Sequence, residues 1–148
     1  MNNNMTENIN GKNELNKFNK YDTETIEILK KRAEHNCRGL VDKTYVYNSL
    51  KKTDIGFYFH IKDIPVAFIC VNMVNDEELN IPLICSIKNN NNLGSELINL
   101  VFEYAKSNKY TKITLECDTI YEKFYKKFGF YITKRLMMDF IYMTKNID

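Results

Sequence analysis

The last third of the chain holds the residue types most suited to proton-transfer chemistry. The apolar residues 113–115 run into Glu116 and Asp118, and Tyr125 follows shortly before Gly129. This pattern predicts a buried strand that ends on carboxylates, then a short helix that carries a phenol and stops at the glycine. A phenol with an ordinary pKa of about 10 is a poor base but a reasonable proton donor to a leaving group of similar basicity. The tyrosine also fits a purely structural role, because several aromatic residues share its helix.

The acidic residues near the strand ends are candidate proton acceptors. Glu116 alternates with Leu115 and Cys117, so its side chain is expected to leave the core face. Glu77 and Glu78 belong to a short acidic turn, where side chains are usually only solvated. The residue types alone leave a catalytic role open for each of Glu77, Glu78, Glu116 and Asp118. We expect Glu116, with Glu78 as the alternative, to accept the substrate proton.

A second group of residues, 84–95, has the pattern of an anion site. Ile84 and Ser86 end an apolar run, a polar loop follows, and the clearest predicted helix begins near Gly94. A helix N-terminus after a strand and a loop presents unpaired backbone N–H groups and the positive end of the helix dipole, which suit a phosphate or pyrophosphate. The candidate binding residues of this segment are Ile84, Ser86, Asn89, Asn90, Asn91, Asn92, Leu93, Gly94 and Ser95. An ordinary turn is the alternative, because asparagine is common in turns.

The composition fits a single packed domain and argues against several classes of protein. The chain has 148 residues, of which 44% are hydrophobic, and a formal charge of +2. Its lysines and glutamates are interspersed, so nothing indicates binding to nucleic acid. No apolar run reaches the ~18–20 residues that a membrane span needs, and no signal peptide opens the chain.

The cysteines and histidines do not predict a metal site. No paired ligand spacing occurs among Cys37, Cys70, Cys85, Cys117, His35 and His60. Three of the cysteines lie in apolar, strand-like runs, which favours buried reduced thiols. A reducing, cytoplasmic location is therefore expected.

Apolar periodicity predicts an α/β fold with a mixed central sheet of about six strands flanked by helices. Residues 1–13 are rich in asparagine and lack this periodicity, so we expect a disordered tail before a domain of residues 14–148. Helices are predicted over residues 24–35, after Asp42, and over residues 94–108 and 121–128. Strands are predicted over residues 55–61, 66–74, 79–87, 112–117 and 130–143, with a weaker signal at 15–18.

These elements, in this order, resemble the GNAT-type N-acetyltransferases over about residues 21–140. The cofactor loop of that family reads Gln/Arg-x-x-Gly-x-Gly/Ala, and the matching positions here are Asn89, Asn92 and Gly94. The resemblance implies that the loop holds the pyrophosphate of acetyl-CoA. It also implies that the strand backbone at Ile84 and Ser86 binds the pantetheine arm and polarises the thioester. Tyr125 matches the tyrosine that protonates the departing thiolate.

Within the family, residues 110–117 and 124–130 are most similar to glucosamine-6-phosphate N-acetyltransferases. This similarity implies a homodimer that acetylates the amine of glucosamine 6-phosphate in UDP-N-acetylglucosamine synthesis, by direct transfer in a ternary complex. It implies that Glu116 helps to orient and deprotonate the substrate amine, and we expect Asp118 to bind substrate as well. The nearest residues for gripping the substrate phosphate are Lys134 and Arg135.

Two departures from the subfamily keep other functions open. The turn at residues 75–78 is acidic where the subfamily carries basic residues, and Asn80 stands where the subfamily has a glutamate. An acidic turn suits a peptide, lysine or polyamine amine at least as well as a phosphorylated one. A non-catalytic binding module of the same fold is the third alternative, because only the last glycine of the cofactor loop is kept.

Overall fold

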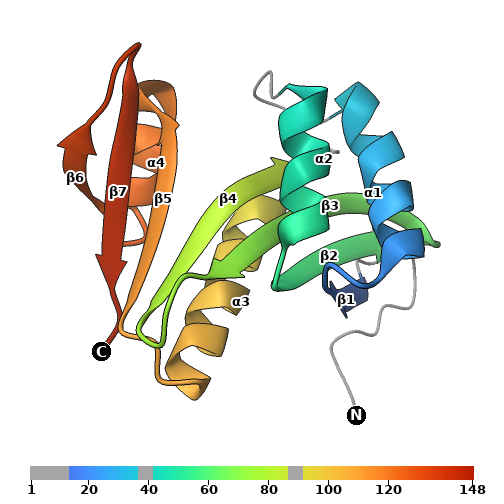
Figure 1. Ribbon diagram of the computed structural model, residues 1–148, viewed down its shortest axis with the longest axis horizontal. Coiled ribbons are helices and arrows are strands. Elements are labelled where there is room, and N and C mark those ends of the chain that lie inside the picture. The colour runs from blue at the N-terminus through green and yellow to red at the C-terminus, as the bar shows by residue number, and fades with distance from the viewer. Residues whose placement is uncertain (1–13, 37–41, 87–91) are drawn as a thin grey trace. The chain divides into compact units, whose positions relative to one another are not determined.

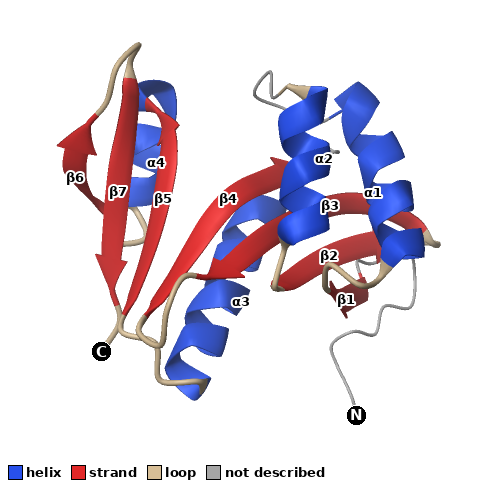
Figure 2. Ribbon diagram, in the orientation of Figure 1, coloured by secondary structure: helices blue, strands red, loops and turns tan. Residues whose placement is uncertain are grey.

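One seven-stranded sheet forms the framework of the described chain. The computed structural model describes residues 14–36, 42–86 and 92–148, and the predicted tail at residues 1–13 lies outside them. The strand order is β1-β2-β3-β4-β5-β7-β6 (Figure 1). The strands are β1 (Glu14–Phe18), β2 (Ile55–Ile61), β3 (Ile64–Met73), β4 (Glu78–Ser86), β5 (Lys112–Asp118), β6 (Tyr131–Arg135) and β7 (Phe140–Asn146). The helices are α1 (Thr23–Asn36), α2 (Lys43–Lys52), α3 (Leu93–Ser107) and α4 (Glu122–Lys126), as coloured in Figure 2.

The predicted mixed α/β class is confirmed, and the differences lie at the two ends of the sheet. β1 is a regular strand, although the sequence signal at residues 15–18 is weak. The single strand predicted over residues 130–143 is wrong, because that stretch forms β6, a turn and the start of β7. Met138 and Asp139 adopt positive φ values of 57° and 64° there, which reverse the chain. The described sheet therefore has seven strands instead of about six.

The chain divides into two compact units, and the boundary between them falls inside β4 and α3. The first unit comprises Met1–Val71 and Leu83–Asn99. The second comprises Asn72–Pro82 and Leu100–Asp148. Neither unit is a continuous stretch of sequence.

Two helices pack on the sheet of the first unit. α1 and α2 lie side by side over β2 and β3 (Figure 1). The predicted apolar stripe of α1 is buried and joins a core made of Phe18, Ile26, Leu29, Ala33, Val46, Leu50, Phe68, Cys70, Leu83 and Cys85. Lys62 and Asp63 form the predicted turn between β2 and β3, with φ values of 50° and 67° that match the twist of a tight hairpin.

The cysteines follow the sequence-based expectation only in part. Cys70 is a free, buried thiol and Cys117 is free and half-buried. Cys85, by contrast, is disulfide-bonded, so the prediction of a reduced thiol is wrong at this residue. Spacing along the sequence does not show which sulfur atoms a fold brings together.

The sheet of the second unit has two chemically different faces. β4 pairs in parallel with β5 from Glu78 opposite Lys112 to Ile81 opposite Leu115, and β5 pairs antiparallel with β7. Since side chains alternate along a strand, one face, here called the apolar face, carries Leu79, Ile81, Ile113, Leu115, Cys117, Ile141 and Met143. The other, here called the polar face, carries Glu78, Asn80, Lys112, Thr114, Glu116, Tyr142 and Thr144.

Candidate active site

Tyr125 lies on α4, a helix of five residues that follows β5 and a 3₁₀ turn at Thr119–Tyr121. Its ring centroid is 5.1 Å from that of Phe124 and 5.8 Å from that of Phe130, and both contacts are edge-to-face. These rings belong to an aromatic cluster that is completed by Phe102 and Phe128. The phenol predicted to donate a proton is therefore held by aromatic packing.

Gly129 ends the segment, as the sequence predicts. The backbone N–H groups of Phe128 and Phe130 donate to the carbonyl oxygen of Tyr125, at 3.0 and 3.3 Å. Gly129 itself has a φ of 93°, a conformation that glycine adopts without strain. A Cβ at this position would also lie 2.6 Å from Nζ of Lys145. The turn after α4 thus needs a glycine for its φ value, whereas the flexible end of Lys145 could move aside for a Cβ.

The environment of Tyr125 keeps its hydroxyl protonated. Burial raises the pKa of the Tyr125 phenol well above its ordinary value, and the nearby Cys117 and Tyr121 add to the rise. Burial also raises the pKa of the Cys117 thiol to about 11, with further contributions from the carboxylates of Asp118, Glu122 and Glu116. Because both groups stay neutral at pH 7, the apolar face presents a protonated phenol and thiol.

The strand predicted to bind the cofactor, β4, pairs with β5 in its first half. In the described residues, pairing of β4 with β5 stops at Ile81, and the next residue, Pro82, has no N–H to donate. Ile84 and Ser86 lie beyond this point and are half-buried, alternating with fully buried neighbours.

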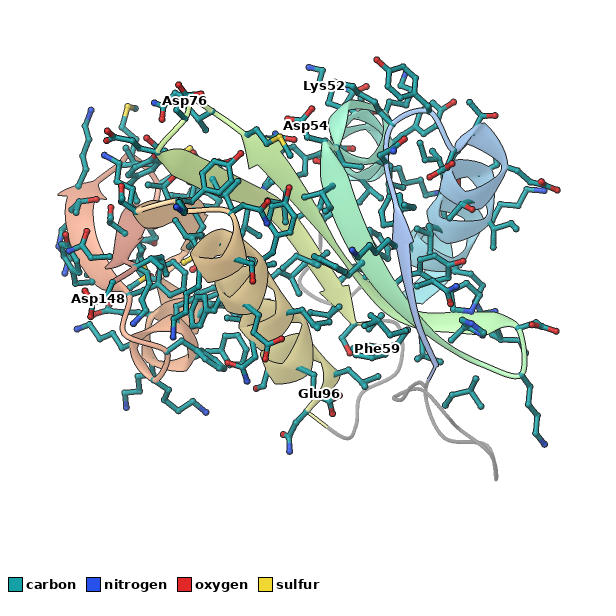
Figure 3. All side chains as sticks on the ribbon, turned by 90° about the horizontal axis from the view of Figure 1, so that it is seen from below. Lys52, Asp54, Phe59, Asp76, Glu96 and Asp148 are labelled. Carbon is teal, nitrogen blue, oxygen red and sulfur yellow. The ribbon has the colours of Figure 1, made fainter. Side chains whose placement is uncertain are left out.

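The predicted anion-binding helix begins at Leu93, one residue before the expected start. Asn92, directly before it, has a φ of 56°, and its carbonyl oxygen accepts the first helical hydrogen bond from Glu96 at 3.1 Å. Figure 3 marks Glu96 in this first turn. Gly94 and Ser95 lie in the same turn, where backbone N–H groups have no partner within the helix. The remaining loop residues, Asn89, Asn90 and Asn91, lie outside the described residues.

Glu78 is held in a hydrogen-bond network on the polar face. The Thr114 hydroxyl donates to its Oε2 at 2.8 Å, and Nζ of Lys112 lies 3.8 Å from its Oε1. Nδ2 of Asn80 donates to Oγ1 of Thr114 at 3.0 Å. Only 14% of the Glu78 side chain is exposed, so this carboxylate is fixed in place, unlike most turn acids.

The turn before Glu78 is shaped by one side chain. Oδ1 of Asn75 accepts from the backbone N–H groups of Glu77 and Glu78, at 2.8 and 2.9 Å. This arrangement leaves the carboxylates of Asp76 and Glu77 exposed, and Figure 3 marks Asp76 at the tip of the turn. The predicted acidic turn is thus present and faces solvent.

Glu116 and Lys134 lie in one row across the polar face. Glu116 pairs with Tyr142 on β7, and Tyr142 pairs with Lys134 on β6. Directly paired residues project to the same side of a sheet. Both charged side chains are exposed.

The two other residues predicted to bind substrate have local roles. Asp118 caps the 3₁₀ turn, and its Oδ1 accepts from the N–H of Ile120 at 3.0 Å. Arg135 pairs with Ile141, one position along from the row of Lys134, so it projects toward the apolar face. A hydrogen bond from Lys126 lowers the pKa of Glu122, and the charge of Arg135 contributes to that shift.

The structure groups the predicted residues of the second unit by sheet face. Glu78, Glu116 and Lys134 share the polar face, whereas Tyr125 packs near Cys117 on the apolar one. The close sequence spacing of Glu116 and Tyr125 therefore does not make them direct partners.

Sequence reasoning noted Asn80 only as the position of the subfamily's glutamate, and it did not link Asn80 or Thr114 to Glu78. The alternation of β4 could have placed Asn80 on the same face as Glu78. Their link to Thr114 depends on the register between two parallel strands, and the three residues lie 34 and 36 positions apart in the chain. No local sequence pattern predicts the register between these two strands.

The fold matches solved structures of N-acetyltransferases. The ribosomal-protein-S18-alanine N-acetyltransferase from Escherichia coli superposes with a TM-score of 0.75 at 14% identity, covering 93% of this chain and 95% of that one. Ard1 from Thermoplasma volcanium gives a TM-score of 0.70 at 19% identity, covering 92% and 98%. The PaiA N-acetyltransferase from Thermoplasma acidophilum, in complex with coenzyme A, gives 0.68 at 15% identity, covering 91% and 99%. Further matches are acetyltransferases of the GNAT family, so this chain has the GNAT fold.

Sequence comparison adds no closer relative. No protein-family model matches the chain, and no curated protein matches its sequence.

In residues 14–36, 42–86 and 92–148, no helix is long and apolar enough to cross a membrane. The same ranges contain no group of three or more His, Cys, Asp or Glu side chains arranged to hold a metal ion.

Proposed function

We propose that this protein is an acetyl-CoA-dependent N-acetyltransferase that transfers the acetyl group directly to an amine in a ternary complex. The observation that carries the proposal is a tyrosine kept protonated by burial, in a fold shared with solved N-acetyltransferases. A buried neutral phenol is suited to protonating a leaving thiolate. The coenzyme A complex of a structural neighbour adds support for the cofactor.

The cofactor segment of this chain fits acetyl-CoA by its backbone chemistry. The backbone of β4 at Ile84 and Ser86 is the segment that the family resemblance assigns to the pantetheine arm, through strand-like hydrogen bonds. The left-handed Asn92 and the first turn of α3 at Gly94 and Ser95 offer N–H groups to a pyrophosphate. Acetyl-CoA supplies the activated acyl group when it is bound.

Three groups of this chain share the work of the transfer. Glu78 takes the proton that an ammonium substrate loses before its nitrogen attacks. Backbone N–H groups of β4 stabilise the negative charge that develops on the acyl oxygen. Attack by the neutral amine forms the C–N bond, and Tyr125 gives its proton to the sulfur as the C–S bond breaks. The second proton that the nitrogen loses on becoming an amide returns the Tyr125 phenol to its neutral form. Glu116, exposed on the polar face, binds the substrate amine.

The first acceptor we propose is the amine of glucosamine 6-phosphate, for UDP-N-acetylglucosamine synthesis. The row across the polar face supports it, because it sets a carboxylate, Glu116, and an ammonium, Lys134, on the same side of the sheet. A carboxylate attracts the amine of an amino sugar, and an ammonium attracts its phosphate. The predicted homodimer and cytoplasmic location belong to the same proposal, and light scattering of the purified protein tests the dimer.

A peptide, lysine or polyamine amine is the second candidate acceptor. The exposed carboxylates of Asp76 and Glu77 favour it, because they attract a cationic substrate and repel a phosphorylated one. The two candidates differ in the substrate charge that the enzyme should prefer: the first predicts a phosphorylated amine and the second a cationic amine.

Thiol release from acetyl-CoA, measured with a panel of amines, tests the proposal. The panel contains glucosamine 6-phosphate, glucosamine, spermidine and a lysine peptide. Turnover with glucosamine 6-phosphate supports the amino-sugar acceptor. Turnover only with spermidine or the peptide supports a peptide, lysine or polyamine amine instead. If no amine gives turnover and acetyl-CoA binds weakly or not at all in calorimetry, the protein is a non-catalytic module and the proposal fails.

A further inference from the structure

We propose that Thr114 and Asn80 are positioning residues that hold Glu78 ready to accept the substrate proton. This inference rests on the proposed acetyltransferase function. It concerns a hydrogen-bond chain on the polar face, Asn80 to Thr114 to Glu78, whose members come from β4 and β5.

The hydrogen bonds of this chain have only one consistent direction. Nδ2 of Asn80 lies 3.0 Å from Oγ1 of Thr114 and 3.2 Å from the Thr114 carbonyl oxygen. A carbonyl oxygen only accepts, so the amide must present its NH₂ group here and not its oxygen. The threonine hydroxyl therefore accepts from Asn80, and its single proton is left for Glu78.

This direction decides which oxygen of Glu78 is available. Oε2 receives the Thr114 proton at 2.8 Å. Oε1 lies 3.8 Å from Nζ of Lys112, a side chain that is 46% exposed. The buried threonine thus occupies Oε2, and Oε1 is the oxygen left to receive a proton.

Burial makes the chain rigid enough to act as a positioning device. Thr114 is 3% exposed and the Glu78 side chain 14% exposed, so water does not replace these contacts at low cost. The backbone register sets Asn80 directly opposite Thr114, and Glu78 lies one pleat away on the same face. A carboxylate oriented in this way is preorganised, because it already has its proton-accepting geometry before the substrate binds.

The matched pair Thr114→Val and Thr144→Val tests the proposal. Both substitutions remove a buried hydroxyl from the polar face, and the two threonines lie directly opposite each other on β5 and β7. The Thr144 hydroxyl bonds to Thr133 at 3.1 Å instead of to Glu78. With the best acceptor of the amine panel, Thr114→Val should lower kcat/KM roughly tenfold, the value of one hydrogen bond to a charged group. Thr114→Ser should restore most of the rate, and Thr144→Val should stay near wild type.

The pH dependence separates positioning from a general loss of structure. Above the pKa of the acceptor amine, the substrate arrives without its extra proton, so Glu78 no longer has to remove that proton. The defect of Thr114→Val should therefore shrink as the assay pH is raised through that value. Thermal unfolding of each variant shows that the protein compared is folded.

Three results would overturn the inference. They are a wild-type rate in Thr114→Val, an equal loss in Thr144→Val, and a Thr114→Val defect that is constant with pH. A wild-type protein that acetylates none of the amines would remove the proposed function itself, and the inference with it. Failure of the inference alone is recognised by normal wild-type turnover.

Discussion

The two faces of the sheet in the second unit surround their functional groups differently. On the apolar face, aromatic rings surround Tyr125, and burial raises the pKa of its phenol so that the proton is retained. On the polar face, the Thr114 hydroxyl donates to Oε2 of Glu78, and Nζ of Lys112 lies 3.8 Å from Oε1. In the proposed mechanism, the apolar face supplies a proton and the polar face accepts one.

This contrast shows how strand alternation can separate an acid from a base. Neighbouring positions on one strand, such as Glu116 and Cys117, belong to environments of different polarity. Burial in an apolar environment keeps a phenol in its neutral, protonated form, whereas a buried carboxylate needs polar partners. The separation predicts that the polar face controls activity more than stability, and that the apolar face supports both.

The largest effect is expected at the proposed base. Glu78→Gln keeps the shape of the side chain but removes its ability to accept the proton, and should lower kcat/KM by about 10²–10⁴-fold. Steady-state thiol release measures the change. Glu116→Gln is the matched control on the same face, where we expect only a few-fold rise in KM for the amine. A larger loss in Glu116→Gln would transfer the role of base to that residue.

The next effect is on stability and belongs to the apolar face. Phe130 is 2% exposed and contacts the ring of Tyr125, so Phe130→Ala should lower the free energy of unfolding by about 3–5 kcal/mol. Urea denaturation measures the loss. The neighbouring aromatic Tyr131 is 44% exposed, and Tyr131→Ala should cost below about 1 kcal/mol. Equal losses would mean that the aromatic cluster is not a core.

Removal of the phenol should have a smaller effect than removal of the base. Tyr125→Phe should slow turnover by roughly 10²-fold or less, because a CoA thiolate is already a fair leaving group. The defect should decrease with thioesters of more acidic thiols, which depart without a proton. Tyr121→Phe, on the preceding turn, serves as the control. An unchanged kcat in Tyr125→Phe would remove the tyrosine from the mechanism.

The smallest effect is the pH dependence of thiol labelling. Burial raises the pKa of Cys117 from 9.0 to about 11, so the folded protein holds less thiolate than the unfolded chain between these values. Alkylation of Cys117 at pH 8 should be at least about tenfold slower in the native protein than in urea. The contribution of this thiol to the free energy of unfolding is fully present below pH 9 and is lost as the pH rises through about 11. Peptide mass spectrometry gives the rate for each cysteine, and fast native labelling would show that the apolar face is hydrated.

The sequence predicts those parts of the site that local patterns encode. The aromatic run and Gly129 predict α4 and its end, and alternation predicts that Glu116 leaves the core face. The separation of β6 from β7 is not visible, because its turn contains Met138 where glycine or asparagine would be the usual signal.

The chain Asn80–Thr114–Glu78 could not be predicted for a different reason. It depends on the register of two parallel strands joined by a long crossover through α3. A shift of that register by one residue would turn Thr114 to the other face, and no local residue pattern specifies it.

The division of β4 and α3 between two units has a consequence for the newly made chain. The core of the first unit contains Phe68 and Cys70 but also Leu83 and Cys85, which follow only after the excursion through residues 72–82. On a ribosome, the first unit therefore cannot complete its interior when β3 emerges and must wait for β4 to be synthesised. By then the first strand of the second unit has also appeared. Folding during synthesis therefore cannot proceed one unit at a time, because the first unit is complete only after the second unit has begun to emerge.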